Sequence, residues 1–362
     1  MGKKKIPEEG IYDARQLGAG RMFVLGFQHM FAMFGATILV PILTGLDVSN
    51  TLLFAGLGTL LFHLITGGKV PAFLGSSFAF LGGYATIAPM LGEQQNIPNL
   101  EMLPYACFGV ACAGLVYVIL AGLFKVFGAK KVMRFFPPIV TGPIIIAIGL
   151  NLSSSAINNC TGNWWIAIAA ILIIVAANIW GKGMIKIIPI LLGVIGSYLL
   201  AVIFDADVRA NLVANVSEAK WFALPIKMEQ TVFGLFASGN VDAHKLLTAV
   251  ITIVPLSLAT MVEHIGDVSA ISSTCNRNYI ENPGLHRTLM GDGLATTLAA
   301  LFGAPANTTY GETTGVLALT RVYDPLVIRL AAVYAIIASF CPKFAALVSA
   351  MPTGTIGGVS IS

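Results

Sequence analysis

Three acidic residues stand within stretches of the sequence that are otherwise apolar. Glu263 and Asp267 fall in the apolar run 246–273, and Glu312 falls in the run 305–320. The first two are four residues apart, so a helix would place them on one face, one turn from each other. An ionisable residue inside a membrane segment is costly and usually functional. Two neighbouring carboxylates repel each other when both are ionised, which favours proton uptake by one of them near neutral pH. The sequence therefore predicts a site in which these acids bind a polar ligand and exchange protons.

The histidines and a fourth acid give weaker signals. His29 stands inside the first apolar run, where it either lines the site or packs as a core histidine. His264 would project about 100° away from Glu263 on a helix, so we expect it to pack elsewhere. Asp292 lies near the start of the ninth apolar run, where helix capping or contact with water explains it as well as function does. Two further histidines near run ends are expected at the membrane interface: His63 and His286.

The same residue types occur in two other kinds of site, a metal site and the site of an intramembrane hydrolase. Glu, His and Asp are metal ligands, but the sequence has neither an HExxH motif nor paired-cysteine spacing, so no metal or cofactor is predicted. An intramembrane hydrolase would need a nucleophile with an orienting base. Ser76 and Ser77 are the candidates, and no G-x-S-x-G or P-loop motif accompanies them.

The composition shows what surrounds the acids. Of 362 residues, 56% are hydrophobic and 10% are charged, against about 25% charged in soluble globular proteins. Such a chain cannot cover itself with polar surface and needs lipid as its solvent. This excludes a soluble enzyme, a nucleic-acid binder and a disordered scaffold.

Apolar runs between charges and turn residues predict a polytopic all-α membrane protein. A twelfth segment is expected to begin at Met351 and to be cut off at Ser362. The other eleven are predicted at 21–44, 50–66, 71–91, 103–126, 135–152, 163–180, 184–204, 246–273, 288–303, 305–320 and 325–342.

The distribution of positive charge predicts the orientation. With a cytoplasmic N-terminus, 16 of the 21 Lys and Arg residues fall on the cytoplasmic side and five on the other side. Cytoplasmic loops carry this excess in membrane proteins. Residues 1–20 are therefore predicted to be cytoplasmic, and 205–245 to form a long extracellular or periplasmic loop.

Two segments share an unusual start. The third opens with Pro71-Ala-Phe-Leu-Gly-Ser-Ser-Phe78, and the tenth opens with Pro305-Ala-Asn-Thr-Thr-Tyr-Gly-Glu312, 234 residues later. An offset of seven segments is odd, so the second copy crosses the membrane in the opposite sense, as in transporters built from inverted repeats with broken helices. Extended backbone at membrane depth frees amide N–H groups, and a half-helix beginning there adds its positive end. Such amides could hold the carbonyl groups of an uncharged polar ligand.

With these residues in place, the chain resembles the nucleobase–ascorbate transporter family, and within it the uracil permease branch. The resemblance covers essentially the whole chain. Its most specific parts are Gln28-His-Met-Phe-Ala-Met-Phe-Gly-Ala-Thr37, Pro71 to Phe80, Glu263-His-Ile-Gly, Asn282-Pro-Gly-Leu-His286 and Asn307-Thr-Thr-Tyr-Gly-Glu312, followed by Gly315 and Thr320-Arg321.

The resemblance implies fourteen segments in two inverted sevens, with short antiparallel strands in segments 3 and 10. A core domain would comprise 21–126 and 246–342. A gate domain would comprise 135–204 and a truncated part beginning at 343–362, with the last segments missing. It implies a homodimer in the bacterial cytoplasmic membrane that imports uracil with protons.

The resemblance also implies roles for single residues. Glu263 and Glu312 would accept hydrogen bonds from uracil, and the backbone amides of Phe78 and Gly311 would donate to its carbonyls. The proton would be held by a group of three acids, Glu263, Asp267 and Glu312. Two more residues would support the pocket: His29 and Tyr310.

The sequence departs from the family pattern at two site positions. Asp267 replaces a second histidine, so it either takes over the proton or signals a shift towards purines such as xanthine or uric acid. Thr313 replaces the signature asparagine, which weakens a hydrogen bond near Glu312. A passive channel and an intramembrane enzyme remain the alternatives from other classes.

Overall fold

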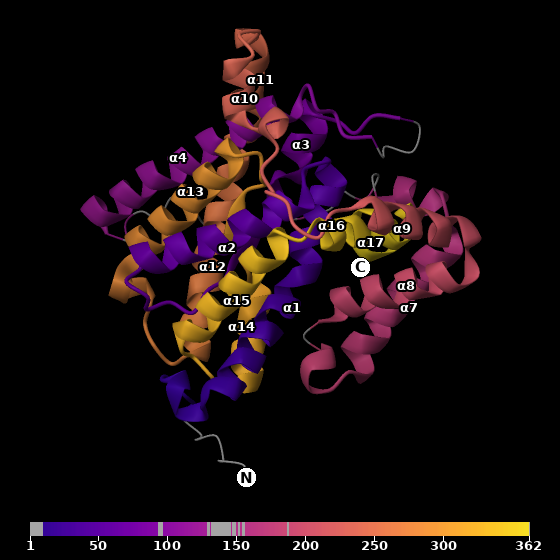
Figure 1. The fold of residues 1–362 in the computed structure, drawn as a ribbon. Helices are drawn as coiled ribbons and strands as arrows, with labels where there is room; N and C mark the ends of the chain where they lie inside the picture. Colours follow the sequence, from indigo (N-terminus) through magenta and orange to yellow (C-terminus); the bar gives the residue numbers. More distant parts are fainter. Residues whose placement is uncertain are drawn as a thin grey trace.

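The computed structural model describes residues 10–92, 97–128, 156–186 and 188–361, with single positions between 129 and 155. Helices dominate this part of the chain (Figure 1). Apart from single positions, the predicted fifth segment, 135–152, lies outside the described residues. The longer elements are α1 (Ala19–Thr44), α2 (Val48–Ile65), β1 (Leu74–Ser76), α3 (Leu81–Ile87), α4 (Leu103–Phe127), α7 (Trp164–Trp180), α8 (Pro189–Phe204), α9 (Ala206–Glu218), α10 (Val232–Ala237), α11 (Ala243–Ile253), α12 (Leu256–Thr274), α13 (Leu285–Leu301), β2 (Asn307–Thr309), α14 (Gly311–Thr320), α15 (Pro325–Ser339), α16 (Pro342–Ser349) and α17 (Thr353–Ile361).

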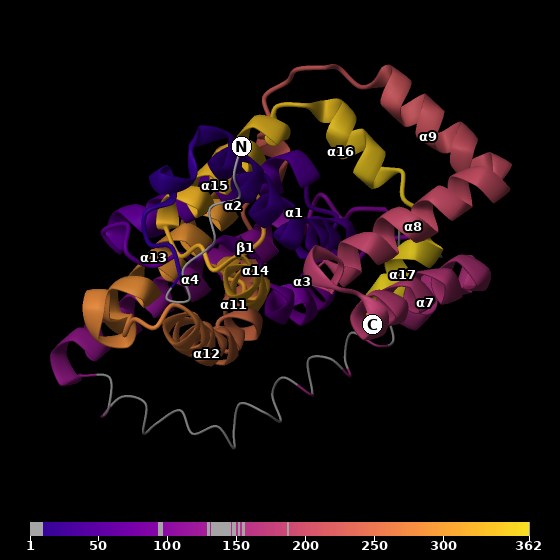
Figure 2. The same cartoon turned by 90° about the horizontal axis from the view of Figure 1, so that it is seen from below.

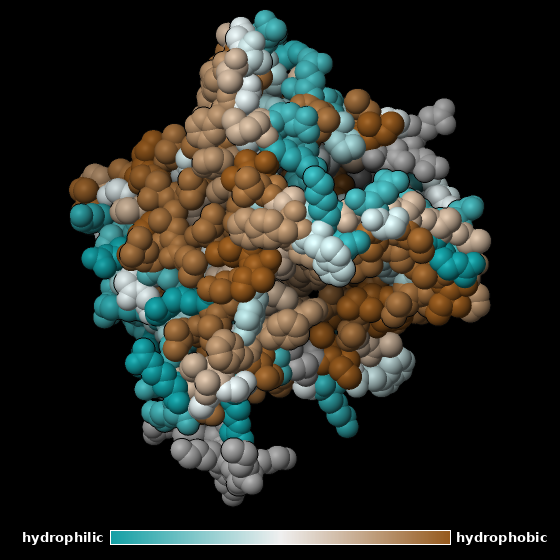
Figure 3. All heavy atoms as spheres, in the orientation of Figure 1, coloured by the Kyte–Doolittle hydropathy of each residue, from teal (hydrophilic) through white to brown (hydrophobic). Residues whose placement is uncertain are grey.

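The helices have the length and surface of membrane spans. Within the described residues, four helical stretches are long and apolar enough to cross a bilayer: 19–44, 48–65, 103–127 and 243–274. Large apolar side chains point outwards from them, as Leu64 and Ile119 do at 78% and 64% exposure. Figure 3 shows a broad hydrophobic band across the middle of the molecule, with hydrophilic residues gathered mostly above and below it. A surface of this kind is stable only in lipid, so the chain is a multi-pass membrane protein.

Segments 3 and 10 are broken, as predicted, and they meet in a two-stranded sheet. β1 pairs with β2 in antiparallel register, with Leu74 opposite Thr309 and Ser76 opposite Asn307. All six strand residues are buried. Extended backbone is tolerated at this depth because protein satisfies it. Thr59 Oγ1 accepts from the Leu74 N–H at 2.9 Å, and the Ser77 N–H donates to the Ala306 carbonyl at 2.9 Å.

The helices pack in two groups. Around the sheet, α4 packs on α13, α13 on α2, α2 on α15, and α15 on α1. Elsewhere α7 packs on α8, and α17 packs on both. Figure 2 shows α7, α8 and α17 together at one side of the molecule, with α9 extending from α8. The assignment of these groups to a core domain and a gate domain stays a prediction.

The stretch 205–245, predicted as a loop, contains regular structure. Asp205 accepts hydrogen bonds from the N–H groups of Asp207 and Val208 and so caps α9, and Thr231 caps α10 in the same way. Capping of this kind stabilises a helix start. Hydropathy at the length of a membrane span did not indicate these helices, because α9 is polar and α10 is apolar but only six residues long. The predicted eighth segment is also interrupted, because α11 ends at Ile253 and α12 begins after Pro255.

The contact between α4 and α13 depends on a glycine. A Cβ atom at Gly114 would lie 2.4 Å from Thr297 Oγ1 and 2.7 Å from the Gly293 carbonyl oxygen. We expect Gly114→Val to lower the free energy of unfolding by about 1–3 kcal/mol, because the two backbones must separate. Thermal unfolding in detergent measures the effect. Gly122→Val is the control, since nothing lies within 4 Å of that position on the same helix, and equal melting temperatures for the two variants would contradict the packing argument.

Candidate substrate site

The three predicted acids come together beside the sheet. α12 carries Glu263 and Asp267, and α14, which packs on α12, carries Glu312 in its first turn. The Glu263 side chain is exposed, and the other two are partly exposed. The charges of Asp267 and Glu312 both act on Glu263. The structure therefore places the three predicted carboxylates near one another beside the sheet, and their role in binding a ligand stays a prediction.

The two predicted amide donors stand at the ends of the strands. Phe78 is the first residue of the short helix Phe78–Phe80 that follows β1, and Gly311 is the first residue of α14 after β2. The first N–H groups of a helix have no partner within it and carry its positive end. Gly311 lies beside the acids, since a Cβ built there would be 3.5 Å from Asp267 Oδ1. Acceptors and donors thus lie close to each other at the broken segments.

Tyr310 supports the strands from within the protein. It is buried, and its hydroxyl donates to the Ser76 carbonyl at 2.7 Å. The Ser76 hydroxyl in turn donates to the Thr37 carbonyl of α1 at 3.1 Å. Tyr310 therefore links the start of α14 to β1, and its role in supporting a ligand pocket stays a prediction.

Gly75 makes room for the Tyr310 ring. A Cβ at Gly75 would lie 2.4 Å from Tyr310 Cε2 and 2.9 Å from Thr37 Oγ1. We expect Gly75→Ala to lower stability by about 1–3 kcal/mol and to weaken ligand binding, because the ring must move off the strand. Thermal unfolding with and without ligand measures both effects. Gly20→Ala, at a position with nothing within 4 Å, is the control, and a Gly75→Ala protein as stable as this control would refute the argument.

His29 and Thr313 lie deeper than the acids. His29 on α1 is fully buried, and neither ring nitrogen has a hydrogen-bond partner among the described residues. The Thr313 hydroxyl, which replaces the family's asparagine, points to Met33 Sδ at 3.6 Å. Thr313 is therefore directed into α1 rather than to a carboxylate, and His29 remains a predicted supporting residue.

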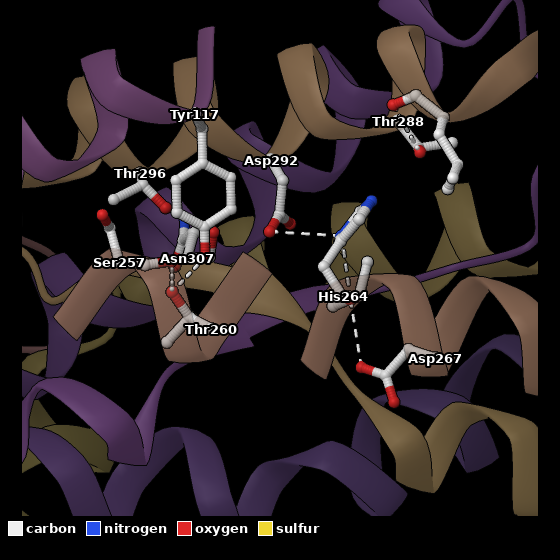
Figure 4. Close-up of polar contacts among 11 residues, drawn as sticks. Tyr117, Ser257, Thr260, His264, Asp267, Thr288, Asp292, Thr296 and Asn307 are labelled. Carbon is white, nitrogen blue, oxygen red and sulfur yellow. Dashed lines mark hydrogen bonds and ion pairs between the residues drawn. The ribbon is translucent and has the colours of Figure 1, made fainter. Parts of the chain in front are cut away.

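The sequence-based reading missed a second polar group behind the acids. Asp292 is fully buried in the middle of α13, so the suggestion of capping or solvation was wrong. His264 does point away from Glu263, but its Nδ1 lies 3.3 Å from Asp292 Oδ2 and 3.2 Å from Thr309 Oγ1. The Thr309 hydroxyl also donates to Asp267 Oδ2 at 3.1 Å. Figure 4 shows His264 between Asp292 and Asp267. The glycines flanking Asp292 in the sequence were the available signal of close helix packing.

His63, predicted at the membrane interface, lies in the last turn of α2 and is surrounded by protein. It is 3% exposed, and its Nε2 lies 2.9 Å from the Ala72 carbonyl oxygen, just before β1. It therefore anchors the entry to the broken segment. Among the described residues, no group of three or more His, Cys, Asp or Glu side chains is arranged to hold a metal ion.

A model of a permease family matches residues 20–362. The chain belongs to this family, the nucleobase–ascorbate transporters. The permease is 40% identical to a probable uracil permease of Haemophilus influenzae, over 92% of this chain and 77% of the relative. It is 41% identical to a uracil permease of Bacillus caldolyticus, over 94% of this chain and 76% of the relative. It is 37% identical to the putative pyrimidine permease RutG of Escherichia coli, over 93% of this chain and 74% of the relative.

A solved structure shares the permease's fold. The transmembrane domain of the cyanobacterial bicarbonate transporter BicA superposes with a TM-score of 0.71 at 15% identity, over 97% of this chain and 88% of that domain. The predicted family and the fold of two inverted sevens with broken segments 3 and 10 are confirmed. As a permease, the protein is a transporter and not an enzyme.

A separate cavity of about 640 Å³ lies away from the acids. It is lined by the ends of α1 and α3, by Asn158, Asn159 and Asn163 before α7, and by residues 349–353 before α17. None of the predicted site residues lines it. The ligand site at the acids and strand ends stays a prediction.

Proposed function

We propose that this permease imports uracil together with a proton across the bacterial cytoplasmic membrane. The observation that carries the proposal is the joint position of Glu263, Glu312 and the first amides of the two half-helices beside the strands. Uracil has two N–H donors and two carbonyl acceptors. Two carboxylates and two free amides complement these groups, and the names of the uracil permease relatives support the same ligand.

In the proposed binding mode, Glu263 and Glu312 accept hydrogen bonds from the uracil N–H groups. The amides of Phe78 and Gly311 donate to its carbonyls. Tyr310 holds the strand ends in place through Ser76, and His29 supports the pocket from α1. Charge-assisted bonds to carboxylates are about twice as strong as neutral ones, so the acids contribute most of the specificity.

The proton enters through the same acids. When the site faces outwards, protonation of one member of the group Glu263, Asp267 and Glu312 reduces their repulsion and permits uracil to bind. Inward exposure then releases both ligands. Coupling arises because the two states differ in affinity for uracil and proton.

The movement and the setting of the protein are part of the proposal. Segments 1–4 and 8–11 form a core that moves against a gate containing α7, α8 and α17, in an elevator-like or rocking motion. The N-terminus is cytoplasmic, as the Lys and Arg distribution favours. Two copies form a homodimer.

Binding of radiolabelled uracil to the purified protein, measured by scintillation proximity at pH 5.5 and 7.5, tests the proposal. We expect saturable binding that is stronger at the lower pH. Folded protein that does not bind uracil at either pH would overturn the choice of ligand, and equal binding at both would overturn the proton coupling.

One observation favours a second ligand class. Asp267 replaces the histidine of the uracil permease pattern, and other branches of the family resemble this sequence there. A xanthine or uric acid permease is therefore the alternative. Competition separates the two, since unlabelled xanthine that displaces uracil at lower concentration than uracil itself would favour the purine.

A further inference from the structure

A series of polar contacts runs from the proposed ligand site into the interior of the core. It begins at Asp267, whose Oδ2 accepts from the Thr309 hydroxyl at 3.1 Å. Thr309 Oγ1 lies 3.2 Å from His264 Nδ1. His264 Nδ1 lies 3.3 Å from Asp292 Oδ2 (Figure 4). Asp267 is partly exposed, whereas His264, Asp292 and Thr309 are 2% exposed or less. The series of contacts therefore connects an accessible carboxylate with a buried one.

The buried end of this series of contacts, at His264 and Asp292, is suited to take up a proton. The groups that lie against the Asp292 carboxylate are the His264 imidazole and the backbone of Thr309. Within the described part of the chain, no lysine or arginine forms an ion pair with Asp292. A fully buried carboxylate without a cationic partner is strongly disfavoured. One additional proton on the His264–Asp292 pair removes that penalty.

We propose that His264 and Asp292 form an internal proton-holding pair that Asp267 loads through the Thr309 hydroxyl. This inference rests on the proposed proton coupling. The protonated Asp267 carboxyl gives its proton to Thr309 Oγ1, and the original hydroxyl proton of Thr309 passes to the His264–Asp292 pair. Asp267 becomes a carboxylate, Thr309 is unchanged, and the pair gains one proton. The reverse sequence returns the proton to Asp267 for release.

Other ionisable groups face the pair from the elements packed around it. α12 contributes Glu263 as well as Asp267, and α14 contributes Glu312. From α4, Tyr117 lies near Asp292 and donates its hydroxyl to Thr260 rather than to the pair. The surrounding charges are thus negative. They favour a proton on the pair, and the Thr309 hydroxyl is the bridge from Asp267.

Removing a single hydroxyl tests the bridge. Thr309→Val preserves the shape and strand propensity of the side chain but cannot pass a proton. Thr309→Ser restores the hydroxyl. Thr308→Val removes a hydroxyl from the adjacent position of β2, whose side chain takes no part in this series of polar contacts, and so is the matched control.

The experiment measures the uracil affinity at pH 5.5 divided by the affinity at pH 7.5. It uses the folded protein with its full sequence. A single linked proton changes affinity by up to about 10-fold per pH unit. We expect a ratio of about 10 or more for the parent protein, Thr309→Ser and Thr308→Val, and below about 2 for Thr309→Val. His264→Gln, which cannot be protonated, should flatten the ratio in the same way and serves if Thr309→Val does not fold.

The outcomes separate this inference from the proposed function. A parent protein that binds uracil equally at both pH values has no linked proton, which overturns the coupling and the pair together. A pH-dependent parent with an equally pH-dependent Thr309→Val or His264→Gln leaves the proposed transport in place and overturns the pair. Loss of pH dependence in Thr308→Val as well would show a general effect of β2 and would also overturn it.

Discussion

Glu312→Ala is expected to abolish measurable uracil binding in the concentration range where the parent protein saturates. The side chain stands in the first turn of α14, next to the strand end, and acts on Glu263 across the site. A hydrogen bond to a charged group contributes about 2–3 kcal/mol net, so its loss weakens binding by roughly 30- to 150-fold. Scintillation proximity with radiolabelled uracil at pH 5.5 measures the change.

Two variants control this result. Glu281→Ala removes an exposed glutamate on the short helical turn Ile280–Gly284 before α13 and should bind uracil like the parent. Glu312→Gln keeps the shape and one acceptor oxygen, so it should bind more weakly than the parent and more strongly than Glu312→Ala. If Glu312→Ala bound uracil within threefold of the parent, Glu312 would not contact the ligand.

The parts of the site that the sequence predicted are those with a local signature. The Pro-Ala starts at Pro71 and Pro305 stop a helix and expose extended backbone, and their repetition after 234 residues indicated the inverted repeat. Glu263, Asp267 and Glu312 were recognisable because a charge in an apolar run is rare. In both cases the informative residues lie close together in the sequence.

The parts of the site that the sequence did not predict depend on contacts between residues far apart in the chain. Asp292 is 28 residues from His264 along the chain, and nothing in either segment indicates that α12 and α13 bring them to 3.3 Å. The helical angle correctly turned His264 away from Glu263, but it could not show that Thr309 and Asp292 lie on that other side. Likewise, α9 is a polar helix started by the Asp205 cap, so it lacks the apolar signal that predicts spans.

Glu263→Gln is expected to remove most of the pH dependence of transport. The glutamine side chain cannot take up a proton, and without the negative charge at this position Asp267, one turn away on α12, is no longer favoured as a proton acceptor. Uptake into proteoliposomes, measured with and without an inwardly directed proton gradient, should respond to the gradient at least about fivefold in the parent and less than twofold in the variant. Binding should also weaken, by roughly 5- to 10-fold, because a neutral amide is a poorer acceptor than a carboxylate.

Glu312→Gln is the matched control for Glu263→Gln. Both substitutions remove one negative charge from the same site, so a change caused only by weaker repulsion should appear in both. One informative result is that uracil uptake loses its response to the proton gradient in Glu263→Gln and keeps it in Glu312→Gln. That result would mean that proton coupling depends on the face of α12 that continues through Asp267 and Thr309 to His264. A Glu263→Gln protein that transports uracil with the gradient response of the parent would mean that neither Glu263 nor its influence on Asp267 couples the proton.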